Sequence, residues 1–236
     1  MTIVTGADFT HGASLLQFLK SACRFEPTSR IIAFDLGLRD DQLSAISKLP
    51  CPVEVRPFLF GEYPEWMNIR VAAGEYAWKP TIIGMVIQEC DGPLLWMDAG
   101  DVITCKLNRT YAEIARRGFF SPSSSGDLAK WTHEKTLEFF GCDKSWAQGL
   151  RNVNAACVGF DPRHKKAMQL AKAWFAGARD KNVIAPEGSS RSNHRQDQAL
   201  LGVLAHLQGM AGGATSFRGE IRTHCDVDQA DLAAGQ

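Results

Sequence analysis

The sequence predicts a single α/β domain with a mainly parallel central sheet flanked by helices. Short apolar segments alternate along the chain with segments of helical periodicity, which is typical of βαβ units. Residues 94–97, Leu-Leu-Trp-Met, form a run without any polar residue, as expected for an interior strand that is buried on both faces. The 236 residues contain no repeat and no clean linker, so one large domain accounts for the length.

The N-terminal part of the chain alternates regularly between the two kinds of segment. Apolar residues recur at the spacing of one helix face after Gly12, and a second helical segment is stopped by Pro50. The expected elements are a strand at 2–4, a helix at 12–23, a strand at 30–34, a helix at 40–49 and a strand at 53–58.

The middle of the chain is less regular. Pro80 directly follows Lys79 and suits the first turn of a helix. Ser-Pro-Ser-Ser-Ser-Gly-Asp at 121–127 has the composition of a flexible loop, and we expect it to form a lid. The other expected elements are a helical segment at 66–71, a helix at 79–87, the strand at 94–97, a helix at 108–117 and a strand at 118–120.

The last part of the chain is expected to add helices and one strand. These elements are a helix at 131–140, a strand at 153–160, a helix from 161 to about 180, a loop at 185–193 and a helix at 194–207. The acidic and small residues of 226–236 are expected to form a frayed tail, so the folded domain is expected over residues 1–225.

Composition excludes several classes of protein. The formal net charge is zero and no Lys/Arg cluster forms a basic patch, which argues against a nucleic-acid partner. The seven Cys residues are scattered and contain no Cys-x-x-Cys pair, so free thiols in a cytoplasmic protein are expected rather than a zinc framework or a disulfide scaffold. The sequence shows no signal-peptide pattern and no apolar run near the roughly 18 residues of a membrane span. Peripheral membrane contact is left open.

Two carboxylates follow the apolar strand. Asp98 ends the run, and Gly100 and Asp101 come shortly after it. Open α/β sheets bind ligands in the crevice outside the carboxyl ends of their strands, where carboxylates suit a divalent cation that carries phosphate oxygens. In an extended chain the two acids point to opposite faces, but Gly100 permits a turn that brings them together. The alternative is a polar strand end in which Asp98 starts an ordinary turn.

A second polar group opens the last expected helix. Asn193 suits the N-cap, and Gln196 three residues later completes a capping box. His194 and Asp197 then lie on one face of the first turn, with Asp197 near the positive end of the helix dipole. The functional interpretation is a carboxylate held steady towards a crevice, and the alternative is ordinary helix stabilisation.

Histidines offer one further candidate ligand. His224 stands beside Cys225 and Asp226, and a His can complete a mainly carboxylate metal site; a surface position is the common alternative. The remaining histidines have no comparable neighbours and are expected to be structural: His11, His133, His164 and His206.

A glycine pattern at the N-terminus offers a rival enzyme class. Thr5-Gly6-Ala7 followed by Gly12 hints at the dinucleotide loop of a short-chain reductase dependent on NAD(P). Thr10 stands where the middle glycine of that loop belongs, and Tyr76 and Lys79 are three residues apart where that class needs four. The reductase is therefore the less favoured hypothesis.

Four short motifs carry a more specific resemblance. In chain order they are Tyr76-Ala-Trp-Lys79-Pro80, Leu95-Trp96-Met97-Asp98-Ala99, Asn154-Ala155 and Arg195-Gln196-Asp197-Gln198. Over roughly residues 1–207 the chain resembles a glycosyltransferase of the GT-A type, from a poorly characterised branch of the nucleotide-sugar transferases. It departs from the Asp-x-Asp motif of that type, because Gly100 takes the third position and Asp101 follows.

The resemblance implies a Rossmann-like domain that binds a nucleoside-diphosphate sugar together with manganese or magnesium. It implies a nucleoside held by Asp35 and by a loop of three residues, Thr5, Gly6 and Ala7. It also implies a cation bound by Asp98, Asp101 and His224, with additional positive charge from Lys79.

The same resemblance places Asp197 near the acceptor and the sugar. There it is expected to act as general base for an inverting reaction or as electrostatic support for a retaining one. Asn154, His194 and Arg195 are expected to contact the sugar or the acceptor. The expected function is sugar transfer to an unknown glycan, lipid or protein acceptor. A non-catalytic nucleotide-sugar binding module of the same fold is the alternative, because the Asp-x-Asp motif is broken.

Overall fold

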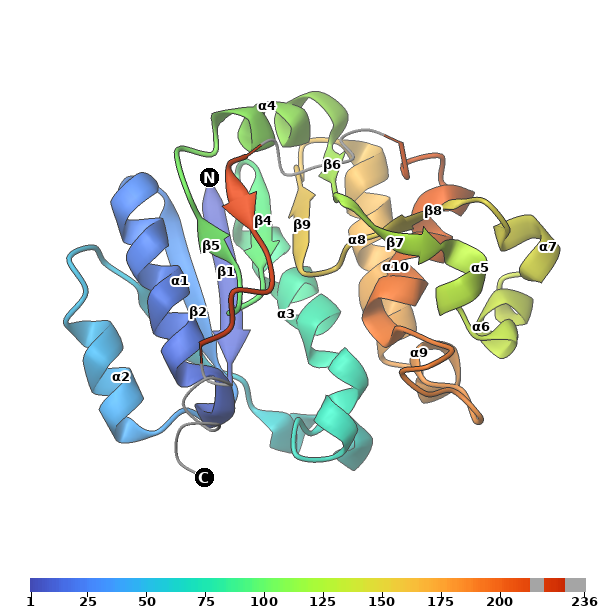
Figure 1. The fold of residues 1–236 in the computed structure, drawn as a ribbon, viewed down its shortest axis with the longest axis horizontal. Coiled ribbons are helices and arrows are strands. Elements are labelled where there is room, and N and C mark those ends of the chain that lie inside the picture. Colours follow the sequence, from blue (N-terminus) through green and yellow to red (C-terminus); the bar gives the residue numbers. More distant parts are fainter. Residues whose placement is uncertain (213–218, 228–236) are drawn as a thin grey trace.

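A six-stranded sheet forms the centre of the molecule (Figure 1). The computed structural model describes residues 1–212 and 219–227 of the chain. The strand order is β3-β2-β1-β4-β9-β6, with β1 to β4 parallel and β9 antiparallel to both of its neighbours. The bounds are β1 (Thr2–Ala7), β2 (Arg30–Asp35), β3 (Glu54–Pro57), β4 (Leu94–Met97), β6 (Phe119–Phe120) and β9 (Cys157–Phe160). The predicted α/β fold with a mainly parallel sheet is confirmed.

Strand β4 is the interior strand that its composition predicted. It lies between β1 and β9, and all four of its residues are 0% exposed. Leu94 and Trp96 belong to the apolar core on one face of the sheet, whereas Leu95 and Met97 belong to the core on the other. Because side chains alternate along a strand, a run without polar residues is what burial on both faces requires.

Helices cover both faces of this sheet (Figure 1). Leu15, Phe18 and Leu19 of α1 pack on one face, whereas α3, α8 and α10 fill the other with residues such as Ile82, Trp174 and Leu200. The bounds are α1 (Gly12–Phe25), α2 (Asp40–Ser47), α3 (Trp78–Val86), α4 (Asn108–Arg117), α5 (Leu128–Trp131), α6 (Glu134–Phe139), α7 (Lys144–Ala147), α8 (Lys165–Ala178), α9 (Lys181–Ile184) and α10 (Gln196–Leu207). Among the described helices, none has both the length and the apolar character that crossing a bilayer demands.

The segment predicted as a flexible lid is instead paired. Ser123–Asp127 forms β7, which is antiparallel to β8 (Arg151–Val153) with an irregular register. The expected strand at 153–160 is consequently split, because β8 lies in this small sheet and β9 in the central one. Local composition favoured a loop at 121–127, but a partner strand distant in sequence supplied the missing backbone hydrogen bonds. The lid prediction is therefore wrong.

The C-terminal segment returns to the main body of the domain. We call residues 219–227 the strap. Its strand β10 (Ile221–Arg222) pairs with β5 (Val102–Ile103), directly after β4. The expected tail began at 226, yet the N–H of Val227 donates to Ser14 Oγ at 3.0 Å, so the ordered chain continues past the predicted boundary. The rest of that expected tail, residues 228–236, lies outside the described residues.

Two of the seven cysteines form a disulfide, contrary to the expectation of free thiols. Cys23 in α1 is joined to Cys51, which follows α2, across a sequence separation of 28 residues. The bond was missed because a pairing between scattered cysteines is not readable from their spacing.

Loss of this disulfide should lower the free energy of unfolding by about 3–4 kcal/mol, which is the chain-entropy value for a loop of this length. The measurement is the melting temperature with and without a reductant. The variant Cys23→Ala/Cys51→Ala is the control, because its melting temperature should be lower and should no longer respond to the reductant. A wild-type protein whose melting temperature ignores the reductant contradicts the prediction.

Candidate active site

The carboxyl ends of three parallel strands bring the predicted acidic residues to one edge of the sheet. Ala7 pairs with Asp35 across β1 and β2. The β1–β4 register pairs Val4 with Trp96, so its continuation sets Asp98 level with Gly6. Because these strands are parallel, their ends meet at the crevice where such sheets bind ligands.

At this edge a buried lysine lies between two carboxylates. Lys79 is in the first turn of α3 and is only 3% exposed. Its Nζ lies 2.9 Å from Oδ1 of Asp98 and 3.2 Å from Oδ2 of Asp197, and it donates to the carbonyl of Ala155 at 3.3 Å. The side chain of Asp98 is 37% exposed and that of Asp197 only 8%. Asp98 therefore faces the crevice, while Lys79 and Asp197 stand behind it.

The charges of this group are strongly coupled. Burial opposes the charged form of Lys79, but attraction to Asp197 and Asp98 outweighs burial and raises the lysine pKa. Burial also raises the pKa of Asp197, and Lys79 offsets that rise only in part. The raised pKa of Lys79 favours a charged lysine, whereas the raised pKa of Asp197 favours a neutral acid. We assign the ionised pair, because the lysine charge is shared by two carboxylates. Trp96 Nε1 further fixes Asp98 by donating to its Oδ1 at 2.7 Å.

Helix α10 carries Asp197 and fixes its position beside Lys79. Asp197 lies in the first turn, as predicted, and its backbone carbonyl accepts from Trp174 Nε1 at 2.9 Å. The predicted capping box is wrong, since the helix starts at Gln196 without a side-chain cap. The side-chain Oδ1 of Asn193 instead accepts a hydrogen bond from the backbone N–H of Ser190 at 2.7 Å, which closes the preceding turn.

A left-handed turn precedes Lys79. The helical segment expected at 66–71 is replaced by short 3-10 turns, and every residue from 72 to 76 has a positive φ, between 46° and 61°. Only Gly74 is a glycine, and left-handed backbone costs other residues roughly 1–2 kcal/mol each. Glu75 accepts a hydrogen bond from Nε2 of Gln196 at 3.1 Å, which ties this turn to the start of α10. Backbone strain of this kind clusters at functional sites.

Asp101 carries an unsatisfied buried carboxylate. The N–H of Asp101 donates to the carbonyl of Asp98 at 3.0 Å, so the turn that Gly100 was expected to permit is present. The Asp101 side chain is buried, and neither oxygen makes a hydrogen bond of good geometry to any described residue. Burial and then the charge of Asp98 raise its pKa, and the charge of Lys79 and the nearby backbone N–H of His224 offset this rise only partly.

The strap places a further acid beside this turn. The carboxylate of Asp226 lies close to the backbone of Gly100, since a Cβ at that position would be 2.3 Å from one of its oxygens. His224, the ligand expected from the sequence, is exposed and has φ 56°. The sequence did not single out Asp226 as a candidate ligand, because it is far from Asp98 along the chain. The signal that could have found it is its position two residues after His224, in the same segment.

These residues fit a hard divalent cation in their donor chemistry. Within 1–212 and 219–227, no three His, Cys, Asp or Glu side chains already converge as a complete metal site. Asp101 nevertheless offers two buried oxygens without partners, and Asp98 and Asp226 add carboxylates beside it. Oxygen donors of this kind are those that magnesium and manganese prefer.

The nucleoside-binding residues predicted at the N-terminus lie in a strand rather than a loop. Thr5, Gly6 and Ala7 are buried within β1, so the glycine pattern has no phosphate-binding loop and the reductase hypothesis loses its basis. The Thr5 hydroxyl is buried and has no hydrogen-bond partner among the described residues. Asp35 ends β2, and its Oδ1 accepts from the backbone N–H groups of Gly37 and Leu38 at 2.8 and 2.6 Å.

His194 does not line the crevice as predicted. It is fully buried, its Nδ1 accepts from the N–H of His133 at 3.1 Å, and its Nε2 donates to the carbonyl of Ile184 at 2.7 Å. Burial lowers its pKa to about 4, so the ring is neutral. Both nitrogens are used by the backbone, so we do not retain His194 as a substrate contact.

The other two predicted contacts have partners that leave part of each side chain available. Asn154 is buried, and its Oδ1 accepts from the N–H of Ala156 at 2.7 Å. The guanidinium of Arg195 lies 3.8 Å from the ring centre of Trp131 and donates to Ser124 Oγ at 3.3 Å. Both therefore stay candidates for contacts to a sugar or an acceptor.

Comparison with known proteins identifies the fold. No protein-family model matches the chain, and no curated protein matches it in sequence. The galactosyltransferase LgtC, solved with donor and acceptor sugar analogs, matches at 17% identity and a TM-score of 0.57, over 96% of this chain and 88% of that one. An active-site mutant of LgtC matches at 16% identity and 0.58, over 100% and 96%. The bifunctional glycosyltransferase WbbM matches at 11% and 0.57, over 86% and 37%. The chain thus shares the GT-A fold of these enzymes.

Proposed function

We propose that the protein is a glycosyltransferase that takes its sugar from a nucleoside-diphosphate sugar with the help of a divalent cation. The observation that carries the proposal is the group of Asp98, Lys79 and Asp197, with Asp101 beside it, at the ligand-binding edge of a GT-A sheet. A buried lysine of α3 held between a carboxylate of α10 and one at the end of β4 is a preorganised charge arrangement, which is what transfer to and from a diphosphate needs.

Each member of the site has a proposed role. Asp98 and Asp101 would hold the cation, with Asp226 or His224 as a further ligand, and the bound cation would neutralise the departing diphosphate. Lys79 adds fixed positive charge to the same place. Asp197 is buried behind Lys79, so we propose that it keeps this lysine charged and oriented, which favours electrostatic support over direct proton abstraction.

Residues around this centre are proposed to contact the two substrates. Thr5, Gly6, Ala7 and Asp35 lie at the strand ends nearest to Asp98 and are proposed to face the nucleoside. Asn154 and Arg195 are proposed to contact the sugar or the acceptor. A non-catalytic binding module is the second candidate, because the acids at 98 and 101 depart from the Asp-x-Asp spacing.

A ligand screen tests the proposed function. Thermal unfolding is followed with nucleoside diphosphates and their sugars, each with and without manganese, because a ligand that binds only the native state raises the melting temperature. Stabilisation by a nucleotide sugar and its manganese-dependent hydrolysis or transfer support the enzyme. Stabilisation without any turnover supports the binding module, and a lack of response to all nucleotides contradicts both.

Replacement of the cation ligands should separate metal binding from folding. Asp98→Ala should abolish manganese-dependent binding of the diphosphate but should also cost stability, since it leaves Lys79 with one partner fewer. Asp101→Asn should weaken that binding at least roughly tenfold, the equivalent of about 1.4 kcal/mol, with little change in the melting temperature, because the amide oxygen of Asn can still accept from the nearby backbone N–H of His224. Calorimetric titration measures both effects. Unchanged manganese dependence in folded Asp101→Asn would remove Asp101 from the site.

A further inference from the structure

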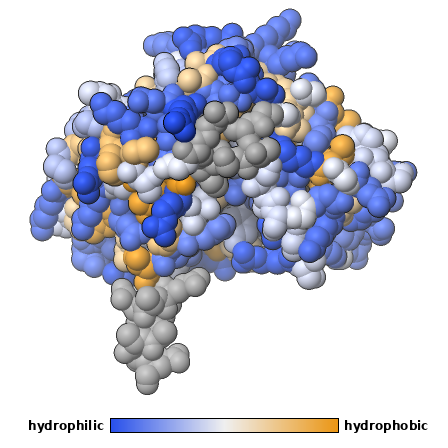
Figure 2. All heavy atoms as spheres, turned by 45° about the horizontal axis from the view of Figure 1, so that its top comes forward, coloured by the Kyte–Doolittle hydropathy of each residue, from blue (hydrophilic) through white to orange (hydrophobic). Residues whose placement is uncertain are grey.

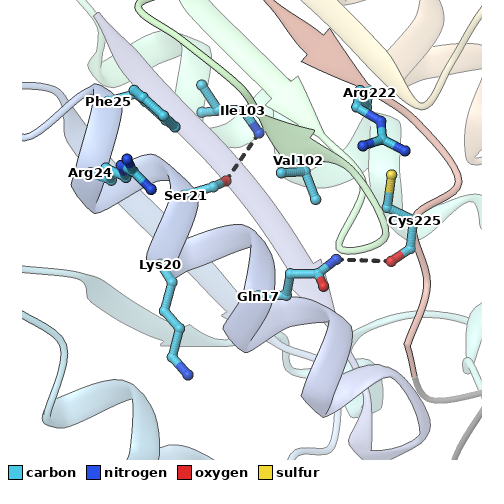
Figure 3. A pocket seen from close by; sticks show the side chains of 9 residues that line it. All are labelled: Gln17, Lys20, Ser21, Arg24, Phe25, Val102, Ile103, Arg222 and Cys225. Atoms are coloured by element: carbon cyan, nitrogen blue, oxygen red, sulfur yellow. Dashed lines mark hydrogen bonds between the residues drawn. The ribbon is translucent and has the colours of Figure 1, made fainter.

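A groove outside the candidate active site combines positive charge with apolar surface. It lies between α1 and the strap, with a volume of about 500 Å³ (Figure 3), which is within the range of small-molecule sites. Its cations are Lys20 and Arg24 from α1 and Arg222 from the strap, and none of the described residues that line it is acidic. Its apolar residues are Phe25, Val102 and Ile103.

None of the three cations of the groove is neutralised by a described carboxylate, although the Arg24 guanidinium lies 5.0 Å from the ring centre of Phe25. Lys20, Arg24 and Arg222 form no ion pair with any residue that the structure describes. The nearest acid along α1, Glu26, is directed elsewhere, because it accepts the N–H of Leu107 at 2.8 Å. Within the described part of the chain, an anion in the groove would therefore meet cationic side chains and no acidic one.

The neutral polar groups of the groove are already engaged. Ser21 Oγ accepts the N–H of Ile103 at 3.0 Å and donates to the carbonyl of Phe18 at 2.7 Å. Gln17 Nε2 donates to the carbonyl of Cys225 at 2.8 Å (Figure 3). Recognition in this groove consequently rests on charge and apolar contact.

The partial negative charge at the C-terminal end of α1 does not cancel the preference of the groove for anions. The helix ends at Phe25, and its carbonyl end carries a partial charge of roughly −0.5. Arg24 lies in the last turn of α1, and Lys20 and Arg222 line the same groove, so three unit positive charges still outweigh this partial negative charge.

The strap connects the groove to the candidate active site. Arg222 and Cys225 form its wall in the groove, and the N–H of Cys225 donates to the carbonyl of Gly100 at 2.7 Å, within the turn from Asp98 to Asp101. Asp226 follows directly and lies against Gly100. A ligand that holds Arg222 therefore also holds the segment that supplies Asp226.

We propose that this groove binds an anionic amphiphile and that its occupancy holds the strap against the turn from Asp98 to Asp101. We assign the phosphate group to Arg24 and Arg222, because Lys20 extends away from both of them (Figure 3), and the hydrocarbon part to the surface of Phe25 and Val102. The binding is independent of the proposed function, whereas an effect on sugar transfer rests on it.

Calorimetric titration of the full chain tests the binding. Decyl phosphate should bind, inorganic phosphate should bind more weakly, and the uncharged decyl maltoside should not bind. Arg24→Gln/Arg222→Gln should weaken decyl phosphate binding roughly tenfold or more, since hydrogen bonds between charged groups are the strong ones. The control Lys165→Gln/Lys166→Gln removes the same charge from a second basic depression and should bind normally. Equal loss in both variants, or equal binding of the uncharged amphiphile, overturns the proposal.

The source of the amphiphile is resolved with vesicles. Binding to phosphatidylcholine vesicles that contain phosphatidic acid, with loss in Arg24→Gln/Arg222→Gln, identifies a membrane lipid. Binding of monomeric decyl phosphate without vesicle binding identifies a soluble phosphate ester.

Hydrogen exchange tests the coupling without any nucleotide. Decyl phosphate should slow exchange of the amides of 219–227, including that of Cys225, and should have no such effect in Arg24→Gln/Arg222→Gln. Unchanged exchange in a wild-type protein that binds decyl phosphate overturns the coupling. Because neither readout uses a sugar nucleotide, these results do not depend on the outcome of the ligand screen above.

Discussion

Lys79→Met should strongly reduce sugar transfer and lower the free energy of unfolding by about 3–5 kcal/mol, the usual cost of breaking a buried ion pair from one side. The substitution keeps the length of the side chain but removes the charge that faces Asp98 and Asp197. Both carboxylates are then left close together without their cation, one of them almost fully buried. The loss of a preorganised charge is expected to reduce turnover by roughly 10²–10³-fold.

Denaturant unfolding and turnover are the measurements for this variant, with Lys79→Arg as the charge-retaining control. A second replacement, Lys79→Met/Asp197→Asn, should recover part of the lost stability, because it removes the buried carboxylate that lost its partner. If Lys79→Met unfolds like the wild type, the ion pair seen here contributes nothing to stability. If it also turns over normally, Lys79 is not part of the active site.

The sequence allowed the frame of this site to be predicted but not its contacts. The apolar run at 94–97 predicts a doubly buried strand, and that strand delivers Asp98 to the sheet edge. Helical periodicity after residue 196 likewise anticipates that Asp197 is held by a buried helix. Both predictions rest on local patterns that burial enforces, so they were available without a structure.

The contacts that bring the members of the group together are non-local. The pairing of Lys79 with Asp197 joins residues far apart in the chain, and no pattern in either segment points to the other. Asp226 reaches Gly100 only because the strap crosses the sheet to pair with β5.

For His194 the sequence predicted a substrate contact that the structure does not support. A polar residue next to Asp197 looked functional, but it is buried and both of its nitrogens serve the backbone. A histidine that satisfies buried backbone groups is indistinguishable in sequence from one that binds a ligand.

Asp197→Asn should reduce turnover by roughly 10²-fold or more, which is the range for a lost charge or base at the reacting centre. The substitution preserves shape, and the helix that carries it stays anchored by Trp174 and Leu200. The melting temperature should fall modestly, because Lys79 keeps only Asp98 as an ion-pair partner, while removal of a buried carboxylate offsets part of that loss. Glu187→Gln, which removes an exposed acid, is the control for net charge and should behave like the wild type.

Comparison of single and double variants decides how Asp197 acts. If Asp197 works by keeping Lys79 charged and oriented, Lys79→Met/Asp197→Asn should be no slower than Lys79→Met, because residues that act as a unit are non-additive. A general base that acts by itself predicts multiplied losses in the double variant, with donor affinity unchanged by Asp197→Asn. Full turnover in Asp197→Asn would mean that the acid has only a structural role. Part of that role is its interaction with the helix dipole, which is worth a few tenths of a kcal/mol.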